Sequence, residues 1–479
     1  MNIVASFPEP IEAWARVLKI QTKLHQWAID DADRRFDDLW NLVCDPAVLM
    51  DAWQRVRSNR GARSAGVDGE NVYYVRSIRG EQAFLSELRD SLKAQTFQPV
   101  AVREVMIPKP GGKRRRLGIA TVRDRVVQAA LKTVLEPIFE ADFKPVSYGF
   151  RPKRRAQDAI AEIHHFTSRS YEWVVEGDIK ACFDEIDHTA LMGRVRHRIG
   201  DKRVLGLVKA FLKSGILGED GELRATNTGA PQGGILSPLL SNIALSVLDE
   251  HFVAAWEASM WDSYRREQRR RKDLANYRLV RYADDWVVMV AGTRADAERL
   301  REEAAAVLVP MGLRLSEEKT KIVHIDEGFD FLGMRIQRHR QWGSTKCHVY
   351  TYPTRRGLAS VMAKVKAATI NRTTNQTLTV LLHRLNPMLR GWVNYHRHGA
   401  ASKTFAYLSA YTWRRVWLWL RHKHPHATVA ELRRRYLRKW WPDQDGVVLF
   451  NPATVSIIRY RYRGNNIATP WTTTTVSAA

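Results

Sequence analysis

Arg-Leu-Val-Arg-Tyr-Ala-Asp-Asp-Trp-Val-Val-Met-Val, residues 278–290, is the stretch on which the fold depends. Apolar, β-prone residues flank the adjacent acids Asp284 and Asp285, and this pattern predicts a strand, a tight turn and a second strand. Neighbouring carboxylates repel each other and lose hydration between hydrophobic strands unless a cation, such as a divalent metal ion, compensates. A solvated Asp-Asp turn explains the stretch equally well when it is taken alone, since so short a motif is weakly specific.

The composition indicates a partner that carries many negative charges. The chain has 479 residues, 45% of them hydrophobic, which is enough for a large core and two or more domains. Its formal net charge of +25 favours nucleic acid or an anionic membrane as the partner. No apolar run is long enough to span a bilayer and no signal-like segment follows Met1. We therefore expect nucleic acid and no membrane.

The three cysteines, Cys44, Cys182 and Cys347, are far apart in the sequence. They form neither a disulfide framework nor a Cys-x-x-Cys zinc pair. The pattern predicts a reducing compartment, the cytoplasm, with the cysteines as small buried side chains.

Periodicity predicts a mixture of helices and strands. Residues 11–57 predict two or three helices, whose apolar side carries Trp14, Leu18, Trp27, Phe36, Leu39, Trp40, Leu49 and Trp53. Further helices are expected over residues 82–93, 123–140, 156–166, 188–199, 202–213, 235–248 and 294–308. Strands are expected over residues 102–107, 117–119, 174–179, 315–325, 329–337 and 455–462.

Two loops combine features that suit nucleic acid. Residues 109–116 form an expected hairpin tip with five cations, which is either a solvated loop or a grip on phosphate. Residues 146–155 mix aromatic rings with cations, a combination that suits stacking on bases and pairing with phosphates. Lys319 and Lys321 are weaker candidates, because a solvated strand edge explains them as well.

The composition changes near Gln341. From there to Trp440 the only acid is Glu431, against nineteen lysines and arginines. An ordinary helical domain mixes both charge signs on its surface, so this segment predicts a nucleic-acid face. Aromatic residues are interleaved with the cations, although Trp417 and Trp419 also suit a helical core.

A third acid, Asp178, ends the strand expected over residues 174–179, about a hundred residues before Asp284. If these strands are neighbours in one sheet, three carboxylates converge. Mg²⁺ prefers a few carboxylates together with substrate phosphates. Two such ions would activate a 3′-hydroxyl and steady a triphosphate, which is what phosphoryl transfer requires.

Several sequence blocks now identify a resemblance. Over residues 50–440 the chain resembles group II intron-encoded reverse transcriptases and maturases. The matching blocks occur in the family's order: Ile-Pro-Lys-Pro-Gly-Gly-Lys (107–113), Asp-Arg-Val-Val-Gln (124–128), Ser-Tyr-Gly-Phe-Arg-Pro (147–152), Asp-Ile-Lys (178–180) with Phe-Asp (183–184), Pro-Gln-Gly-Gly-Ile-Leu-Ser-Pro (231–238), Tyr-Ala-Asp-Asp (282–285), Phe-Leu-Gly (331–333) and Gly-Trp-Val-Asn-Tyr (391–395). Each block alone is weak, but their order is very specific.

The resemblance implies an α+β right-hand polymerase followed by an all-helical thumb or maturase domain. The implied domains are an N-terminal helical extension (1–60), fingers and palm (61–338), the thumb or maturase domain X (339–441) and a short tail (442–479) that binds DNA. The implied function is RNA-directed DNA synthesis, with binding of the intron RNA to promote splicing and retrotransposition of the mobile element. The implied partners are intron RNA, an RNA template with a DNA primer, target DNA and dNTPs. The resemblance leaves open whether the protein dimerises.

The resemblance also assigns roles to residues. Asp178, Asp284 and Asp285 would be catalytic and would hold two Mg²⁺ ions, or Mn²⁺ in their place, with the carbonyl of Ile179. The incoming nucleotide would meet Lys109, Arg115 and Gln232, and Phe183 would exclude a ribose 2′-hydroxyl. Core packing remains open for Phe183, as does bracing of a turn for Gln232. Aromatic and cationic side chains expected to contact nucleic acid are Lys113, Arg151, Arg154, Arg155, Tyr282, Trp392, Tyr395, Arg414 and Arg415.

The chain departs from the family in three places. Arg116 and Ala120 replace prolines of the fingers, and Ala181-Cys182 replaces a Gly-Phe pair before Phe183. No cysteine follows Cys347, so we expect no zinc-containing endonuclease and a dependence on nicked or single-stranded target DNA. Two alternatives stay open: a non-catalytic splicing cofactor, which has no use for the acids, and a reverse transcriptase of another system such as phage defence, against which residues 391–395 argue.

Overall fold

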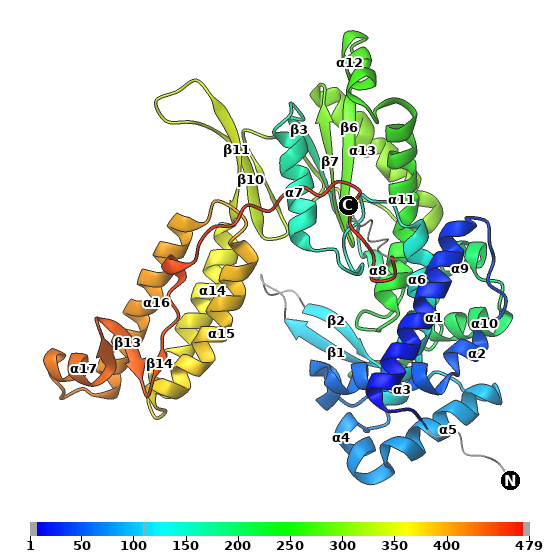
Figure 1. Ribbon diagram of the computed structural model, residues 1–479, viewed down its shortest axis with the longest axis horizontal. Helices are drawn as coiled ribbons and strands as arrows, with labels where there is room; N and C mark the ends of the chain where they lie inside the picture. The colour runs from blue at the N-terminus through cyan, green and yellow to red at the C-terminus, as the bar shows by residue number, and fades with distance from the viewer. Residues whose placement is uncertain (1–6, 109–111, 113, 473–479) are drawn as a thin grey trace, which may run out of the picture.

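The computed structural model describes residues 7–108, 112 and 114–472. Lys109 and Lys113, which we expected at the triphosphate and at nucleic acid, lie outside this range. Figure 1 shows a mixed body of helices and sheets, with a separate group of helices, α14 to α16, beside it. Among the described residues, no helix combines the length and the apolar character that crossing a membrane requires.

The N-terminal helices pack on the long central helix α6, Val122–Asp142. They are α1 (Pro10–Asp30), α2 (Trp40–Val43) and α3 (Pro46–Ser58). Phe36, Leu39, Trp40, Leu49 and Trp53 are buried as predicted. The helix expected over residues 123–140 is confirmed, and because other elements surround α6, most of its side chains are buried.

The predicted apolar face of α1 is wrong. Trp14 and Trp27 are 57% and 42% exposed and Leu18 is only half-buried. The buried face instead includes Val17 and the polar Gln21, whose Nε2 donates to the carbonyl of Thr133 at 2.9 Å. Buried polar groups need a hydrogen-bond partner, and this glutamine has one on α6. Because glutamine is polar, a prediction from hydrophobicity alone could not identify the buried face of α1.

The next elements form the part that carries the cationic hairpin. They are η1 (Arg60–Arg63), α4 (Val72–Tyr74), η2 (Val75–Arg79), α5 (Glu81–Lys93), β1 (Val102–Pro108) and β2 (Arg114–Ile119). The predicted hairpin is confirmed, because β1 and β2 pair antiparallel from Arg103↔Ile119 to Pro108↔Arg114. The sheet continues through β4 (Ile216–Leu217) and β5 (Leu223–Arg224).

A buried acid at the start of α6 gives a pH-dependent prediction. Asp124 is 2% exposed, and burial raises its pKa to about 6, although hydrogen bonds with the Thr121 side chain and from the N–H of Val100, which donates to Asp124 Oδ2, oppose the rise. The folded carboxyl thus binds a proton more tightly than the unfolded one, so this group costs stability progressively as pH rises from about 4 to about 6. We expect Asp124→Asn to stabilise the protein by on the order of 2 kcal/mol above pH 6, and by much less below pH 4, in denaturation series across pH.

Asp201 is the matched control. Although burial opposes the shift, hydrogen bonds from Arg203 and from the N–H groups of Trp40 and Leu39 lower the pKa of Asp201. Asp201→Asn should therefore destabilise the protein above pH 4. A pH-independent gain from Asp124→Asn would contradict the assigned cause.

The main sheet has the strand order β6-β7-β3-β8, with antiparallel neighbours. Its strands are β3 (Trp173–Gly177), β6 (Asn276–Tyr282), β7 (Asp285–Ala291) and β8 (Lys321–His324). Along β7, Trp286, Val288 and Val290 face one hydrophobic core, and Val287 and Met289 face another. The uninterrupted apolar run after Asp285 is explained by this burial on both faces.

Helices cover both faces of this sheet (Figure 1). α7 (Ala156–Thr167) packs on β6, and α11 (Ser237–Ser259) and α13 (Arg294–Leu308) pack on β6 and β3. The remaining helices here are α8 (Cys182–Glu185), α9 (His188–Arg198), α10 (Lys202–Leu212), α12 (Ser263–Arg271) and η3 (Val309–Met311). Cys44 and Cys182 are buried as expected, but Cys347 is exposed.

Two predicted strands were too long. Of residues 315–325 only Lys321–His324 form a strand, β8. Residues 329–337 break into β9 (Phe329–Phe331) and β10 (Met334–Arg340), because Leu332 and Gly333 adopt φ angles of 47° and 75° and turn the chain. β10 then pairs with β11 (Cys347–Pro353).

The C-terminal helices have a hydrophobic core of their own. They are α14 (Arg355–Ala368), η4 (Asn371–Thr373), α15 (Leu378–His396), α16 (Ser402–Lys423) and α17 (Val429–Tyr436). Short elements follow: β12 (Leu437–Arg438), β13 (Trp441–Gln444), β14 (Val447–Val448) and η5 (Pro452–Thr454). Trp419 is 1% exposed and Trp417 packs beside this core, so both rings serve packing.

The predicted strand at residues 455–462 is wrong, because this extended segment pairs with no described strand. It leads the chain back to the body, as the red trace in Figure 1 shows. Arg463 binds Asp158 of α7 at 2.8 Å, and Trp471 Nε1 donates to Gln21 Oε1 of α1 at 3.2 Å. Side chains, not a ladder of backbone hydrogen bonds, hold the tail.

Candidate active site

The three candidate acids lie at one end of the main sheet. β3 and β7 pair as far as Gly177↔Trp286, so Asp178 leaves β3 where Asp285 begins β7. β6 and β7 join through a two-residue turn, Ala283-Asp284, since Tyr282 pairs with Asp285. Neighbouring strands are about 4.8 Å apart. The predicted strand–turn–strand and the predicted neighbourhood of Asp178 are therefore confirmed.

The charges at this end interact strongly. Loss of solvation raises the pKa of Asp285 to about 6, repulsion from Asp284 and Asp178 adds to the rise, and Lys319 opposes it. Asp285 is nevertheless exposed. Of the two causes of the rise, the repulsion from Asp284 and Asp178 is the one that a bound cation can relieve. Lys319 Nζ lies 2.9 Å from Asp178 Oδ2 and already balances that carboxylate.

The acids do not form a ready-made metal cage. In the described part of the chain, no three His, Cys, Asp or Glu side chains are grouped closely enough to hold a metal ion unaided. Mg²⁺ commonly binds through one or two carboxylates and takes its other ligands from water and substrate phosphates. The donor set of Asp178, Asp284 and Asp285, all oxygen and mutually repelling, fits such an ion.

A buried network that the sequence analysis missed holds the turn from behind. The guanidinium of Arg281 is fully buried and binds both carboxylate oxygens of Asp249, and its Nε lies 2.7 Å from Oδ1. It also donates to Asn242 Oδ1 at 3.0 Å and to the carbonyl of Ala283 at 2.9 Å. The signal was an arginine inside an apolar strand, which requires a buried acid nearby.

The Ser-Tyr-Gly block, residues 147–149, packs its backbone against this turn. The N–H of Tyr148 donates to Arg281 O at 2.8 Å, and the N–H of Arg281 donates to Val146 O at 2.9 Å. A Cβ on Gly149 would lie 2.2 Å from the backbone nitrogen of Ala283. Only glycine permits this approach, so residues 147–149 brace the turn through their backbone.

Two residues expected at the nucleotide meet each other. Arg115 Nε donates to Gln232 Oε1 at 2.8 Å, and the Gln232 carbonyl accepts from the N–H of Gly118 at 2.7 Å. Gln232 therefore braces its loop against β2, as the alternative interpretation stated. Its contact with a nucleotide stays a prediction.

Phe183 lies next to the same loop. Its carbonyl accepts from the N–H of Ala230 at 2.7 Å. Phe183 is 9% exposed and therefore buried, so core packing remains open for it. Ile179 is buried and pairs with Leu315, and metal binding by its carbonyl stays a prediction.

The expectation that Arg151 and Arg154 contact nucleic acid is wrong. Arg151 Nη2 lies 2.7 Å from Glu140 Oε1, its Nη1 donates to Ser147 O at 2.8 Å, and its side chain is 2% exposed. Arg154 is 6% exposed and donates to Pro145 O at 3.0 Å. A buried guanidinium needs such partners, and these two fold the loop. Arg155 is exposed and remains a candidate.

Among the other residues expected at nucleic acid, Tyr395 joins the C-terminal helices to the body, whereas Trp392 and Arg415 make contacts within those helices. The Tyr395 hydroxyl donates to Leu332 O at 2.7 Å, and burial, with repulsion from Tyr282, raises the pKa of Tyr395 to about 12. Trp392 lies 4.2 Å from the His396 ring. Arg415 donates to Thr369 O at 2.9 Å at the end of α14. These side chains act in packing, whereas Arg414 is exposed.

The cations of residues 341–440 are unusual in their lack of acidic partners. Within the described ranges, none of the nineteen forms a salt bridge. Arg433 stacks over Trp440, which is 55% exposed, at 3.6 Å from the ring centre. Cations without acidic partners, with exposed rings among them, are typical of a face that binds a polyanion.

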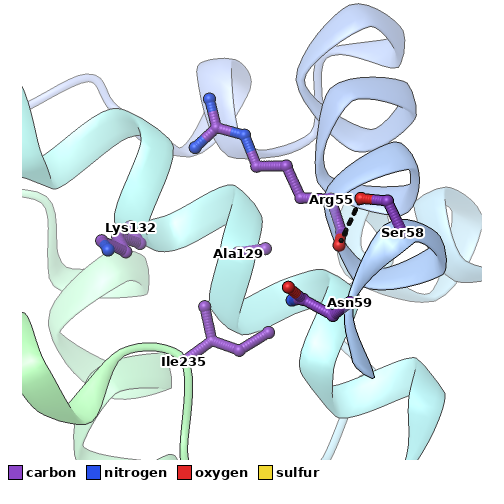
Figure 2. A pocket seen from close by; sticks show the side chains of 6 residues that line it. All are labelled: Arg55, Ser58, Asn59, Ala129, Lys132 and Ile235. Atoms are coloured by element: carbon purple, nitrogen blue, oxygen red, sulfur yellow. Dashed lines mark hydrogen bonds between the residues drawn. The ribbon is translucent and has the colours of Figure 1, made fainter. Parts of the chain in front are cut away.

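A small pocket of about 280 Å³ lies between α3, α6 and the loop before α11 (Figure 2). Its cations are already paired: Arg55 lies 2.8 Å from Asp51 and Lys132 lies 3.5 Å from Glu136. We assign no function to this pocket.

Comparison with known proteins agrees with this geometry. The reverse transcriptase (RNA-dependent DNA polymerase) family model matches residues 107–336, and the group II intron maturase-specific domain matches residues 358–441. Protein YkfC of Escherichia coli is 39% identical over 68% of the chain and 89% of its own length. The group II intron-encoded protein LtrA of Lactococcus lactis is 33% identical over 66% of the chain and 59% of LtrA. Nuclear intron maturase 1 of Arabidopsis thaliana is 27% identical over 49% and 42%.

The matched ranges include all three acids, the Arg281 turn and the unpaired cations of α15 to α17. The chain spans only 59% of LtrA and 42% of the Arabidopsis maturase. The structure, the two family models and the extensive likeness to YkfC together show that this chain belongs to the family of group II intron-encoded reverse transcriptases and maturases.

Proposed function

We propose that the chain is an RNA-directed DNA polymerase that uses two Mg²⁺ ions, or Mn²⁺, at Asp178, Asp284 and Asp285. The observation that carries the proposal is the register of β3 against β7, which brings Asp178 beside the Ala283-Asp284 turn. A purely RNA-binding protein has no use for three repelling carboxylates at one strand end.

The proposed chemistry assigns tasks to the chain's own residues. When bound, the metal ions would activate a primer 3′-hydroxyl and neutralise charge on the triphosphate. Asp178 and Asp284 would hold them, with Asp285 as the third acid and the Ile179 carbonyl completing one shell. Arg281 fixes the turn that carries Asp284, which preserves the geometry on which positioning depends.

The nucleotide would enter between the cationic hairpin and the loop of Gln232. Arg115, exposed and 2.8 Å from Gln232, would bind the triphosphate together with Lys109. Phe183, anchored through its carbonyl to Ala230, would exclude the 2′-hydroxyl and so select dNTPs.

The domain arrangement is part of the proposal. Residues 1–60 would form the N-terminal extension, residues 61–338 the fingers and palm, and residues 339–441 the thumb and maturase domain X. The tail, residues 442–479, would contribute to DNA binding. The three free cysteines fit a reducing compartment, and we propose the cytoplasm.

The proposed maturase activity rests on binding of intron RNA by the unpaired cations of residues 341–440. RNA affinity should fall steeply with salt, since each phosphate contact releases counterions. With six to ten contacts, we expect a loss of about 10³- to 10⁵-fold between roughly 50 and 200 mM salt. Filter binding of the intron RNA across salt concentrations measures this, and a flat response would refute electrostatic docking.

Primer extension tests the polymerase proposal. The purified chain is given an RNA template with an annealed DNA primer, dNTPs and Mg²⁺, and cDNA is measured with and without EDTA. We expect cDNA that requires the metal ion. A folded protein that binds the primed template but makes no cDNA would overturn the proposal and favour a splicing cofactor.

A further inference from the structure

A groove of about 1160 Å³ is lined by residues of α7 and of the hairpin β10–β11. Its third wall is the extended segment 457–462, which crosses from η5 to α7 (Figure 1). The groove reaches Ser170 and Glu172, which precede β3, whereas Asp178 follows that strand. At about 3.3 Å per residue, the length of β3 separates this end of the groove from the candidate active site.

The groove has an excess of available positive charge. Its arginines are Arg169, Arg338, Arg459 and Arg461. Glu172 is the one acid among its described lining residues, and Arg338 binds that carboxylate. Arg459 and Arg461 are exposed and make neither an ion pair nor a side-chain hydrogen bond within the described part of the chain. An anionic occupant would find these two guanidinium groups free.

The backbone of the same segment is available too. Ile458 bonds to residues after α15: its N–H donates to Arg397 O at 3.0 Å and its carbonyl lies 2.9 Å from His398 Nδ1. From Arg459 to Tyr462, no backbone hydrogen bond forms with any described residue. N–H groups without a backbone acceptor, beside free guanidinium groups, are donors suited to phosphate oxygens.

Rings alternate with these cations. In the sequence, Tyr460 follows Arg459 and Tyr462 follows Arg461, and both rings line the groove. On the wall formed by β11, the lining ring is Tyr350, which is 38% exposed. His165 lies 4.5 Å from the Tyr462 ring. Burial and Arg169 lower the pKa of His165, which favours its uncharged ring. Rings of this kind stack on unpaired bases.

We propose that this groove binds a single strand of nucleic acid, with phosphates on Arg459 and Arg461 and a base on Tyr350. A duplex would keep its bases paired and away from these rings, so the occupant is single-stranded. This site is separate from the carboxylates and from the cations of α15 to α17. The bound strand would lie between α7, the hairpin β10–β11 and the segment 457–462, where the C-terminal helices join the body.

Salt-dependent binding of short oligonucleotides tests this site. Oligo(U) RNA and oligo(dT) DNA of about 12 nucleotides, within the usual range of single-strand sites, are titrated without dNTPs or Mg²⁺, so the result does not depend on polymerisation. Each lost phosphate contact lowers the slope of log K against log salt by about 0.7. For Arg459→Ser/Arg461→Ser we therefore expect a slope about 1.4 smaller than that of the wild type.

The matched control is Arg294→Ser/Arg301→Ser. These arginines are exposed on α13 and lie outside the groove, so the slope should not change. An unchanged slope in the Arg459/Arg461 variant, with an unaltered melting temperature, would overturn the proposal. A loss confined to RNA would identify the ribose strand as the ligand, and equal losses would show that both strands are accepted through phosphate and base.

Stacking gives a second and independent measurement. Tyr350→Ala should weaken oligonucleotide binding roughly 5-fold or more, in the range of one base–ring stack. Tyr264→Ala removes a ring that is 69% exposed on α12 and should have no effect. Equal affinities of the two variants would contradict a base on Tyr350.

Discussion

Replacing Asp284 with asparagine is expected to reduce cDNA synthesis by roughly 10³-fold or more. Asn keeps the size of the side chain and removes the charge that would bind a metal ion. Metal ions contribute several kcal/mol of transition-state stabilisation, and each 1.4 kcal/mol is about tenfold in rate. Single-turnover primer extension under saturating dNTP measures the loss. Since Asp284 is in a turn and relieves repulsion when neutralised, stability should not fall.

Asp33→Asn is the control for this prediction. Asp33 is exposed after α1 and its side chain has no described partner, so full activity is expected. RNA binding by the Asp284 variant should also match the wild type, because the unpaired cations of residues 341–440 are untouched. Undiminished cDNA from a folded Asp284→Asn protein would remove the carboxylates from the mechanism.

The sequence was sufficient to predict the strand–turn–strand around Asp284 because both of its faces are buried. A strand between two hydrophobic cores reads as an apolar run, and the acids interrupt it at the turn. The neighbourhood of Asp178 required an assumption about strand order, which periodicity does not contain. The sequence analysis could only state it as a condition, and the pairing of Gly177 with Trp286 meets that condition.

The errors share one physical cause: tertiary partners that the sequence does not display. Arg151 looked like a phosphate ligand, but Glu140 and backbone carbonyls bury it. Trp14 and Trp27 looked buried, but the face of α1 that packs on α6 carries Gln21 instead. The tail looked like a strand, but it follows side-chain contacts to α7 and α1. Charge and polarity predict a class of partner, not its identity.

The Arg281 network connects stability with the active site. Arg281 belongs to β6, Asp249 and Asn242 to α11, and Ser147 to the brace of the turn. One guanidinium thus ties the sheet, its covering helix and the Ala283 carbonyl together. A solvent-exposed arginine could not do this, because water would compete for every one of its hydrogen bonds.

Arg281→Met should therefore destabilise the folded protein by about 3–5 kcal/mol, since it leaves the buried Asp249 without a counter-charge. Chemical denaturation measures this loss. As the control, Arg301→Met removes one member of a partly exposed ion pair on α13, and its free energy of unfolding should stay within about 0.5 kcal/mol of the wild-type value. A loss as small as that of the control would contradict the network.

The double variant Arg281→Met/Asp249→Leu separates the two roles of the network. Removing both charges should recover much of the lost stability, because an apolar pair of similar volume replaces a buried ion pair at little cost. The Ala283 carbonyl would still lack its donor, so the turn that carries Asp284 would be less fixed. We expect cDNA synthesis to remain well below that of the wild type at a temperature where the double variant is folded. Full recovery of both properties would mean that Arg281 stabilises the fold without positioning the turn.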